Sequence, residues 1–313
     1  MGEQVYKFHF APLQGYSDHI FRNAFEKYFG GIDVYYTPFI RIEKGDFRKR
    51  DLRDIGPEFN HGLELVPQIL PGTHDEFCRL AEMLCDRGYC RVDVNLGCPF
   101  PLVAGKKKGA GMLPYPELVE EILCAMKEFS DIQFSLKMRL GWEDVKESLL
   151  LVDIINCFPL EHITLHARTG RQQYKGSVQL DAFAAFYELV KHPLFYNGDI
   201  LTIEDIKRIL GMFPALKGIA IGRGLLADPW LVAAYKQLNI GDEKKHKEVL
   251  ALFHYELFSA YAAVLQGNAQ LLSKMKSFWE YFLPTTDRKL LKMIKKSNRI
   301  SQYNEAVKLI FGR

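Results

Sequence analysis

Short apolar or β-branched runs alternate with amphipathic stretches through the first 235 of the 313 residues, and this alternation constrains the fold most. Strands are expected at residues 7–13, 34–39, 63–69, 91–96, 133–138, 162–166, 194–197 and 218–221. Helices fit between them at 75–87, 116–129, 148–155 and 203–210, with Thr73 and Thr202 as N-caps. A repeated βα unit requires parallel strands, and eight of them close into a (β/α)8 barrel, an α/β fold.

The charge of the chain is unevenly divided. Residues 236–313 hold fourteen Lys/Arg and seven Asp/Glu, although the whole chain carries only +3. The length favours one large α/β domain and a smaller one. We therefore expect a catalytic barrel at residues 1–238 and a basic, all-helical domain at 239–313 that binds a polyanion and is not needed for the barrel to hold its cofactor.

The cysteines and the apolar runs limit where such a chain works. The six cysteines form no CxxC pair and show no metal-ligand spacing, so no metal site is expected. No secretory signal opens the sequence, which favours reduced thiols in a cytoplasmic protein. No apolar stretch approaches the roughly 20 residues needed to cross a bilayer, so no membrane association is expected.

Polar groups stand where nearly every expected strand ends. Any one of them, taken alone, is equally well explained as a paired structural residue, but their repetition indicates a shared ligand. In chain order they are Pro12-Leu13-Gln14, Pro38-Phe39, Gln68, Asn95 with Cys98, Lys137 with Arg139, His166 with Arg168, Asn197 with Asp199, and Gly222-Arg223.

Three of these strand ends suggest chemistry. The run 94–100 presents Cys98 before a proline, in an active-site arrangement, although a small buried thiol is the plainer interpretation. The glycine turns 197–199 and 222–224, with Arg223, are typical of phosphate binding. Gln68 and Lys137 suit a flat, electron-rich heterocycle, with an internal ion pair as the alternative for Lys137. The lysines that follow in the loop, Lys106, Lys107 and Lys108, suit a polyanion or a solvated turn.

Residues 7–235 resemble the tRNA-dihydrouridine synthases in the order and spacing of their motifs, and the helical tail matches more loosely. The resemblance rests on 11–18, Asn95-Leu96-Gly97-Cys98-Pro99 with its Gly-Ala-Gly loop, 136–142, His166-Ala167-Arg168-Thr169, 197–199 and 221–224. Leu13-Gln14 and Tyr16-Ser17 replace the usual Met-Ala and Val-Thr, and Ala167 replaces a glycine. The run 275–279 leans towards the bacterial branch called DusC.

The resemblance implies a cofactor, an electron donor and a substrate. It implies NADPH as the electron source and a tRNA uridine as the acceptor, with a hydride passing from reduced flavin to C6 and a proton from the Cys98 thiol to C5. Asn95, Arg139 and Arg168 would contact the substrate, and no obligate protein partner is expected, which makes a monomer. FMN would be bound by Pro12, Leu13, Gln14, Gln68, Lys137, His166, Asn197, Gly198, Asp199, Gly222 and Arg223.

The tail carries a basic stripe. Arg288, Lys292, Lys295 and Arg299 recur at helical spacing and are expected on one helix face as tRNA contacts, with a merely solvated face as the alternative. Two rival functions remain open at this point. One is a flavin oxidoreductase for a free pyrimidine, similar to dihydroorotate dehydrogenase, and the other is a non-catalytic RNA-binding barrel.

Overall fold

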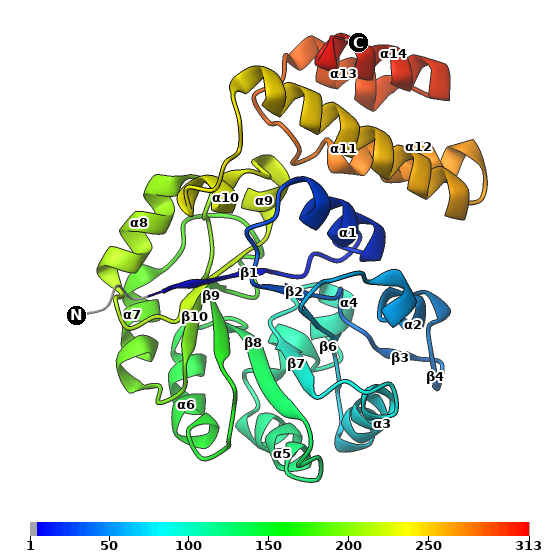
Figure 1. The fold of residues 1–313 in the computed structure, drawn as a ribbon. Coiled ribbons are helices and arrows are strands. Elements are labelled where there is room, and N and C mark those ends of the chain that lie inside the picture. Colours follow the sequence, from blue (N-terminus) through cyan, green and yellow to red (C-terminus); the bar gives the residue numbers. More distant parts are fainter. Residues whose placement is uncertain (1–4, 313) are drawn as a thin grey trace.

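A closed barrel of parallel strands forms the body of the computed structural model, which describes residues 5–312 (Figure 1). This confirms the predicted α/β barrel. The sheet has the order β5-β2-β1-β11-β10-β9-β8-β7-β6. Its strands are β1 (Lys7–Phe10), β2 (Val34–Tyr36), β5 (Leu65–Val66), β6 (Gln68–Ile69), β7 (Arg91–Leu96), β8 (Gln133–Gly141), β9 (Ile163–Thr169), β10 (Leu194–Asn197) and β11 (Gly218–Ile221).

The barrel closes through the third predicted strand, which is divided at Pro67. Its first half, β5, pairs with β2, and its second half, β6, pairs with β7. Proline has no N–H to donate to a ladder, while its carbonyl accepts the Asp93 N–H at 2.9 Å. The two edges of the nine-segment sheet are therefore consecutive in the chain, and eight strands form a ring.

Helices cover the outside of the barrel (Figure 1). The four predicted helices are confirmed with ends shifted by a few residues, and Thr73 and Thr202 cap α3 and α8 by accepting backbone N–H groups. Within residues 5–312 no helix is long and apolar enough to cross a membrane. The covering helices are α1 (His19–Tyr28), α3 (His74–Cys85), α5 (Pro116–Met126), α6 (Lys146–Ile155), α7 (Leu180–Leu189), α8 (Ile203–Met212) and α10 (Leu231–Tyr235), with the short α4 (Pro101–Ala104), η2 (Gly109–Met112) and α9 (Arg223–Ala227) in loops.

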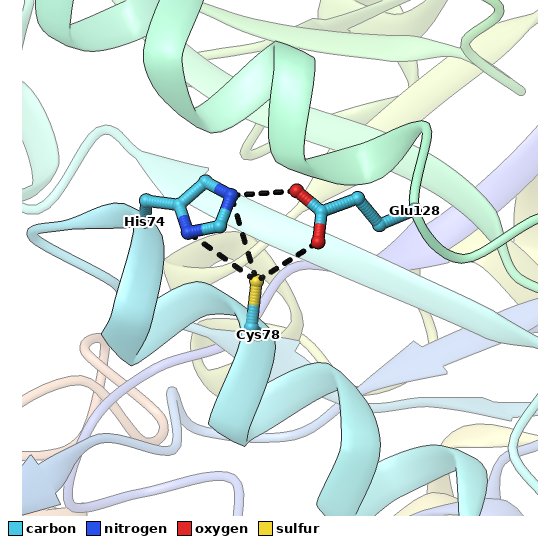
Figure 2. Close-up of side chains that lie close together, drawn as sticks. All are labelled: His74, Cys78 and Glu128. Atoms are coloured by element: carbon cyan, nitrogen blue, oxygen red, sulfur yellow. Dashed lines mark hydrogen bonds and ion pairs between the residues drawn. The ribbon is translucent and has the colours of Figure 1, made fainter.

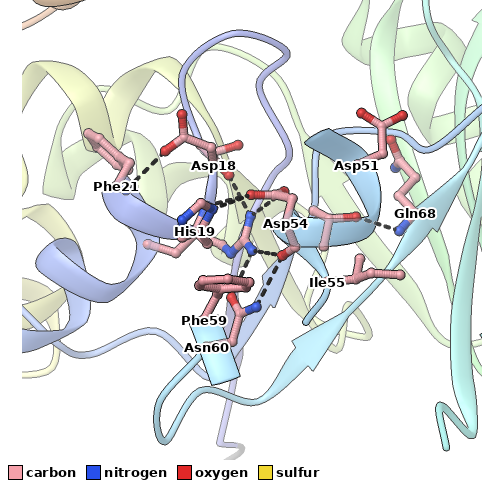
Figure 3. Close-up of polar contacts among 12 residues, drawn as sticks. Asp18, His19, Phe21, Asp51, Asp54, Ile55, Phe59, Asn60 and Gln68 are labelled. Atoms are coloured by element: carbon pink, nitrogen blue, oxygen red, sulfur yellow. Dashed lines mark hydrogen bonds and ion pairs between the residues drawn. The ribbon is translucent and has the colours of Figure 1, made fainter. Parts of the chain in front are cut away.

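An excursion between β2 and β5 was not predicted. It consists of β3 (Ile42–Glu43), β4 (Asp46–Phe47), α2 (Lys49–Asp54) and η1 (Pro57–Phe59). Its anchor is Asp54, which lies between His19 and Asn60 in Figure 3. The Arg22 guanidinium is fully buried and pairs with the Asp54 carboxylate at 3.1 Å. Because that charge has a partner, the excursion is held firmly against α1.

Four further helices lie together beside α1: α11 (Glu243–Val264), α12 (Gly267–Phe278), α13 (Arg288–Lys296) and α14 (Ile300–Phe311) (Figure 1). Their contact with the barrel is apolar at its centre. The Phe253 ring is buried and lies 4.9 Å from that of Phe29 and 5.7 Å from that of Phe21. Removing these helices would expose this surface, so the packing argues against the expectation that the barrel is independent of them.

The basic stripe does not occupy one helix. Arg288, Lys292 and Lys295 lie on α13, but that helix ends at Lys296 and Arg299 is the extended N-cap of α14. Ser297 ends α13, because its backbone is extended and its hydroxyl donates to the Ile294 carbonyl at 2.7 Å. The prediction of a single face containing Arg299 was wrong for this reason, although all four side chains are exposed.

Asp18 joins the barrel to the added helices and yields the first prediction. Its carboxylate caps α1 and accepts hydrogen bonds from Tyr261 at 2.6 Å and Lys274 at 2.8 Å. Asp18→Ala should therefore lower the free energy of unfolding by about 2–4 kcal/mol in urea titrations, a cap plus two buried-edge bonds. Asp242→Ala removes only the cap of α11 and should cost about 1 kcal/mol. Equal losses in the two variants would contradict a linking role for Asp18.

Candidate active site

A cavity of about 530 Å³ opens at the carboxyl ends of the barrel strands. Asn95, Cys98 and Arg139 line it, as do all eleven residues predicted to hold the cofactor. Those eleven are Pro12, Leu13, Gln14, Gln68, Lys137, His166, Asn197, Gly198, Asp199, Gly222 and Arg223. The structure thus brings together side chains from seven strand ends, as expected for this fold.

Cys98 follows β7 in a turn that Asn95 holds. The Asn95 amide oxygen accepts the N–H groups of Gly97 at 3.0 Å and Cys98 at 2.8 Å. The loop returns closely enough that a Cβ on Gly109, whose φ is +57°, would lie 2.9 Å from the Cys98 Cβ. Burial raises the pKa of the Cys98 thiol, against a smaller opposing effect of the Phe100 N–H. Cys98 is therefore a protonated thiol at neutral pH.

A buried hydrogen-bond chain supports Asn95 from below. Asp93 accepts hydrogen bonds from Ser135 and Gln68, both at 2.6 Å, and Gln68 in turn accepts one from Asn95 at 2.7 Å. Complete burial raises the pKa of Asp93 to about 7, although both hydrogen bonds oppose the shift. The chain spans β6, β7 and β8, so the position of Asn95 is set by three strands at once.

Lys137 brings a cation to the floor of the cavity. Its ammonium donates to the Asn197 amide oxygen at 3.0 Å, and Asn197 donates to the Ala220 carbonyl at 2.7 Å. Burial, with a smaller contribution from Arg139, lowers the pKa of Lys137 to about 8. Because the direct partner is an amide, the internal ion pair considered for Lys137 is not what this contact shows.

Asp199 organises the two glycine turns. It adopts a φ of 43°, and its carboxylate pairs with Arg223 at 3.0 Å and with Arg168. The Arg168 guanidinium is 1% exposed, also donates to the Gly176 carbonyl at 2.7 Å, and lies behind the cavity wall rather than on it. Arg168 thus braces Asp199, in contrast to the substrate contact predicted for it.

Two other predicted residues have defined electrostatic states. Burial, followed by the charge of Arg139, lowers the pKa of His166 well below its usual value, so this imidazole is neutral at pH 7. Arg139 donates to the carbonyls of Gly97, Thr169 and Gln173 at 2.8–2.9 Å. It therefore fixes the Cys98 loop while keeping a position on the cavity wall.

The triple lysine lies apart from the cavity. Lys108 pairs with Glu76 at 2.5–2.7 Å, Lys107 lies 3.9 Å from the centre of the Tyr115 ring, and Lys106 is exposed. Among the residues that the structure describes, the cavity wall includes none of the three. Two of these cations thus have intramolecular partners, and only Lys106 is directed wholly to solvent.

The cavity also has walls that sequence reasoning missed. The excursion after β2 supplies Arg41, Arg48 and Arg50, whose close spacing in the sequence was a usable signal. Tyr174, in the loop after β9, lies 4.3 Å below the Arg223 guanidinium. Tyr281 comes from the segment between α12 and α13, and no local pattern marks it.

Comparison with known proteins points to one family. The profile of the family described as dihydrouridine synthase (Dus) matches residues 9–312. A tRNA-dihydrouridine(16) synthase of Pseudomonas syringae is 32% identical over 241 residues, covering 74% of this chain and 75% of its own. A tRNA-dihydrouridine synthase B of Pasteurella multocida is 30% identical over 229 residues, covering 73% and 68%.

Solved structures share the barrel at low sequence identity. A histamine dehydrogenase from Rhizobium sp. 4-9 has a TM-score of 0.58 at 13% identity, covering 80% of this chain and 49% of its own. A morphinone reductase in complex with tetrahydroNAD has a TM-score of 0.55 at 10% identity, covering 76% and 89%. At these identities the likeness establishes the fold alone.

The raised pKa of Asp93 predicts a pH-dependent stability. An unfolded aspartate loses its proton near pH 4, whereas the folded one keeps it to about pH 7. The contribution of Asp93 to stability should therefore fall as pH rises from about 4 to about 7 and then level off. Asp93→Asn keeps both neighbours as partners and should lack this component when urea unfolding is compared with wild type. An unfolding difference that is constant from pH 4 to 7, as expected for the exposed control Asp131→Asn, would contradict the assignment.

Proposed function

Because the chain belongs to the dihydrouridine synthase family, we propose that it is an FMN-dependent enzyme that uses NADPH to reduce the C5=C6 bond of specific uridines in tRNA to 5,6-dihydrouridine. The observation that carries this proposal is the charge of the cavity. Among the described residues, Asp199 is the one carboxylate on its wall, against six cations: Arg41, Arg48, Arg50, Lys137, Arg139 and Arg223. Such a wall suits a bound phosphate and a polyanionic substrate.

The residues present fit FMN. Gly222 lies so close to Leu13 that a Cβ there would meet the Leu13 side chain at 3.3 Å, while Arg223 stands beside this turn at the cavity rim. These groups would hold the phosphate, and Lys137 with Gln68 would contact the ring. When bound, FMN would supply the hydride that reaches C6 of the uracil. NADPH would serve as the electron source.

Cys98 would complete the reduction by giving its proton to uracil C5. The raised pKa keeps the thiol protonated at neutral pH, which suits an acid and not a nucleophile. Asn95 and Arg139 hold the loop that carries the thiol, so they would also set the position of the proton. One Asn95 N–H has no partner within the chain described above and remains for a uracil edge.

The four added helices, residues 239–313, would form the tRNA-binding domain of a monomer. Arg288, Lys292 and Lys295 of α13, with the neighbouring Arg299, are exposed and suit phosphate contacts. The exposed Lys106 would add a contact near the cavity. An enzyme for a free pyrimidine would need neither these cations nor the arginines of the excursion, and the intact Cys98 and Lys137 favour a catalytic barrel over a merely RNA-binding one.

The phosphate assignment predicts a loss of cofactor. Arg223→Ala should weaken FMN binding roughly 10- to 100-fold, the value of one or two charge-assisted hydrogen bonds. Flavin fluorescence titration of the apoprotein measures this directly. Arg208→Ala, which removes a surface arginine paired with Asp205, should bind FMN normally. Wild-type affinity in Arg223→Ala would exclude this arginine as the phosphate ligand.

The acid assignment predicts a defect confined to one half-reaction. Cys98→Ala should bind FMN and oxidise NADPH at wild-type rates, because neither step needs the thiol proton. It should reduce tRNA uridine roughly 10²- to 10⁴-fold more slowly, as for the loss of a general acid. Single-turnover reduction of tRNA separates the two steps, with the exposed Cys90→Ala as the matched control. Dihydrouridine formation at near wild-type rate in Cys98→Ala would mean that another group supplies the proton.

The tail assignment predicts a defect in affinity. Replacing Arg288, Lys292, Lys295 and Arg299 together by Ala should weaken tRNA binding and reduce its salt dependence by roughly 0.7–0.9 logarithmic units per lost phosphate contact. Binding is measured at two salt concentrations. Replacing the exposed Lys244, Lys245 and Lys247 of α11 serves as a control for net charge. A merely solvated stripe would leave the affinity and the salt slope of the quadruple variant at wild-type values.

A further inference from the structure

A cluster of metal-ligating side chains lies on the outside of the barrel, away from the residues of the cavity. Within residues 5–312 it is the one group of three or more His, Cys, Asp or Glu side chains whose ligand atoms lie within 4.8 Å of one another. Its members are His74, Cys78 and Glu128, and Figure 2 shows the three side chains pointing toward one another. Neither the proposed reaction nor the predicted tRNA contacts use any of them.

Helix periodicity and packing assemble the cluster. His74 is the first residue of α3 and Cys78 lies one turn later, so their side chains share a face. Glu128 lies two residues beyond the end of α5 and is 50 residues from Cys78 in the chain. The packing of Phe77 against Phe129, with ring centres 6.0 Å apart, brings the two segments together beside the cluster.

The distances suit a tetrahedral ion. Bonds of about 2.3 Å to sulfur and about 2.0–2.1 Å to nitrogen or oxygen give edges of roughly 3.3–3.6 Å between ligands. The Cys78 sulfur lies 3.7–3.9 Å from the His74 nitrogens and 3.9 Å from a Glu128 oxygen. The His74 Nε2 and Glu128 Oε1 atoms are hydrogen-bonded at 2.6 Å. Opening that contact by side-chain rotation would admit an ion without moving the helices.

We propose that His74, Cys78 and Glu128 form a zinc site. A thiolate, an imidazole and a carboxylate together favour Zn²⁺ over Mg²⁺ or Ca²⁺, which prefer oxygen ligands alone. Asp75 and Glu82 add negative potential at the sulfur, which attracts a cation. The fourth position is open to water, since all three side chains reach the surface.

The site would clamp two helices that flank a catalytic strand. In the chain, α3 precedes β7 and α5 follows it, and β7 leads into the Cys98 turn. An ion held by both helices stabilises the native state by mass action, because the unfolded chain does not bring Glu128 to the other two ligands. The sequence reading expected no metal, because a His-x₃-Cys spacing has no meaning until packing supplies its third ligand.

Cobalt binding tests the proposal on the full-length, flavin-loaded protein. After chelator treatment, one equivalent of Co²⁺ should produce the intense d–d absorption of a tetrahedral ion, in the red where flavins in the oxidised state do not absorb, and Zn²⁺ should displace it. Cys78→Ser and His74→Ala should weaken Co²⁺ binding at least roughly 100-fold, and Glu128→Gln less. Cys85→Ser, an exposed thiol at the end of the same helix, should bind as wild type does.

Thermal unfolding provides the second measurement. Zn²⁺ should raise the unfolding temperature of wild type and of Cys85→Ser, and should leave that of Cys78→Ser unchanged. The absence of a tetrahedral spectrum in wild type would overturn the proposal and leave His74 and Glu128 as a simple hydrogen-bonded pair. A spectrum that persists in Cys78→Ser, or that Cys85→Ser abolishes equally, would place the metal elsewhere and would overturn it too.

Discussion

One buried carboxylate, Asp93, links the interior of the barrel to the loop that carries Cys98. It lies in the middle of β7 and holds Ser135 of β8 and Gln68 of β6. Gln68 then fixes Asn95, whose oxygen orients the Cys98 N–H. A buried polar group is tolerated only when it is satisfied, so each link of this chain depends on the next. The reactive thiol is therefore positioned by the barrel and not by its loop alone.

The cavity above this chain collects positive charge that the protein itself does not neutralise. Lys137 is buried with an amide as its partner, and its lowered pKa reflects that desolvation. His166 reduces the excess by remaining neutral, and Asp199 pairs with Arg223 at one end. An anionic ligand would relieve the remaining repulsion, so cofactor binding and barrel stability should be thermodynamically linked. The same field would attract the phosphates of a nucleic acid.

The sequence predicted the barrel and most of the cavity because both follow from local patterns. Strand ends of a βα repeat meet at one face, which places Lys137 and Arg223 in the same cavity without knowledge of any contact. It failed where tertiary packing decides. Arg168 was assigned to the ligand but pairs with Asp199 behind the wall, and Arg299 was assigned to a helix that Ser297 ends. Tyr281 reaches the cavity from a segment far along the chain, so no spacing could predict it.

The position of Tyr281 changes how the added helices should be understood. Tyr281 lines the cavity, and its neighbour Glu280 accepts a hydrogen bond from Tyr16 of the barrel at 2.9 Å. Lys274 of α12 binds both Asp18 and the Gly15 carbonyl, in the loop between β1 and α1. The helices are thus part of the wall of the site as well as a surface beside it. An RNA held on α13 would be held in a fixed relation to Cys98, because the apolar contact of Phe253 with α1 leaves no hinge between the two. On this geometry, the choice of uridine would depend on how a rigid surface orients the RNA, and not on movement of one part toward the other.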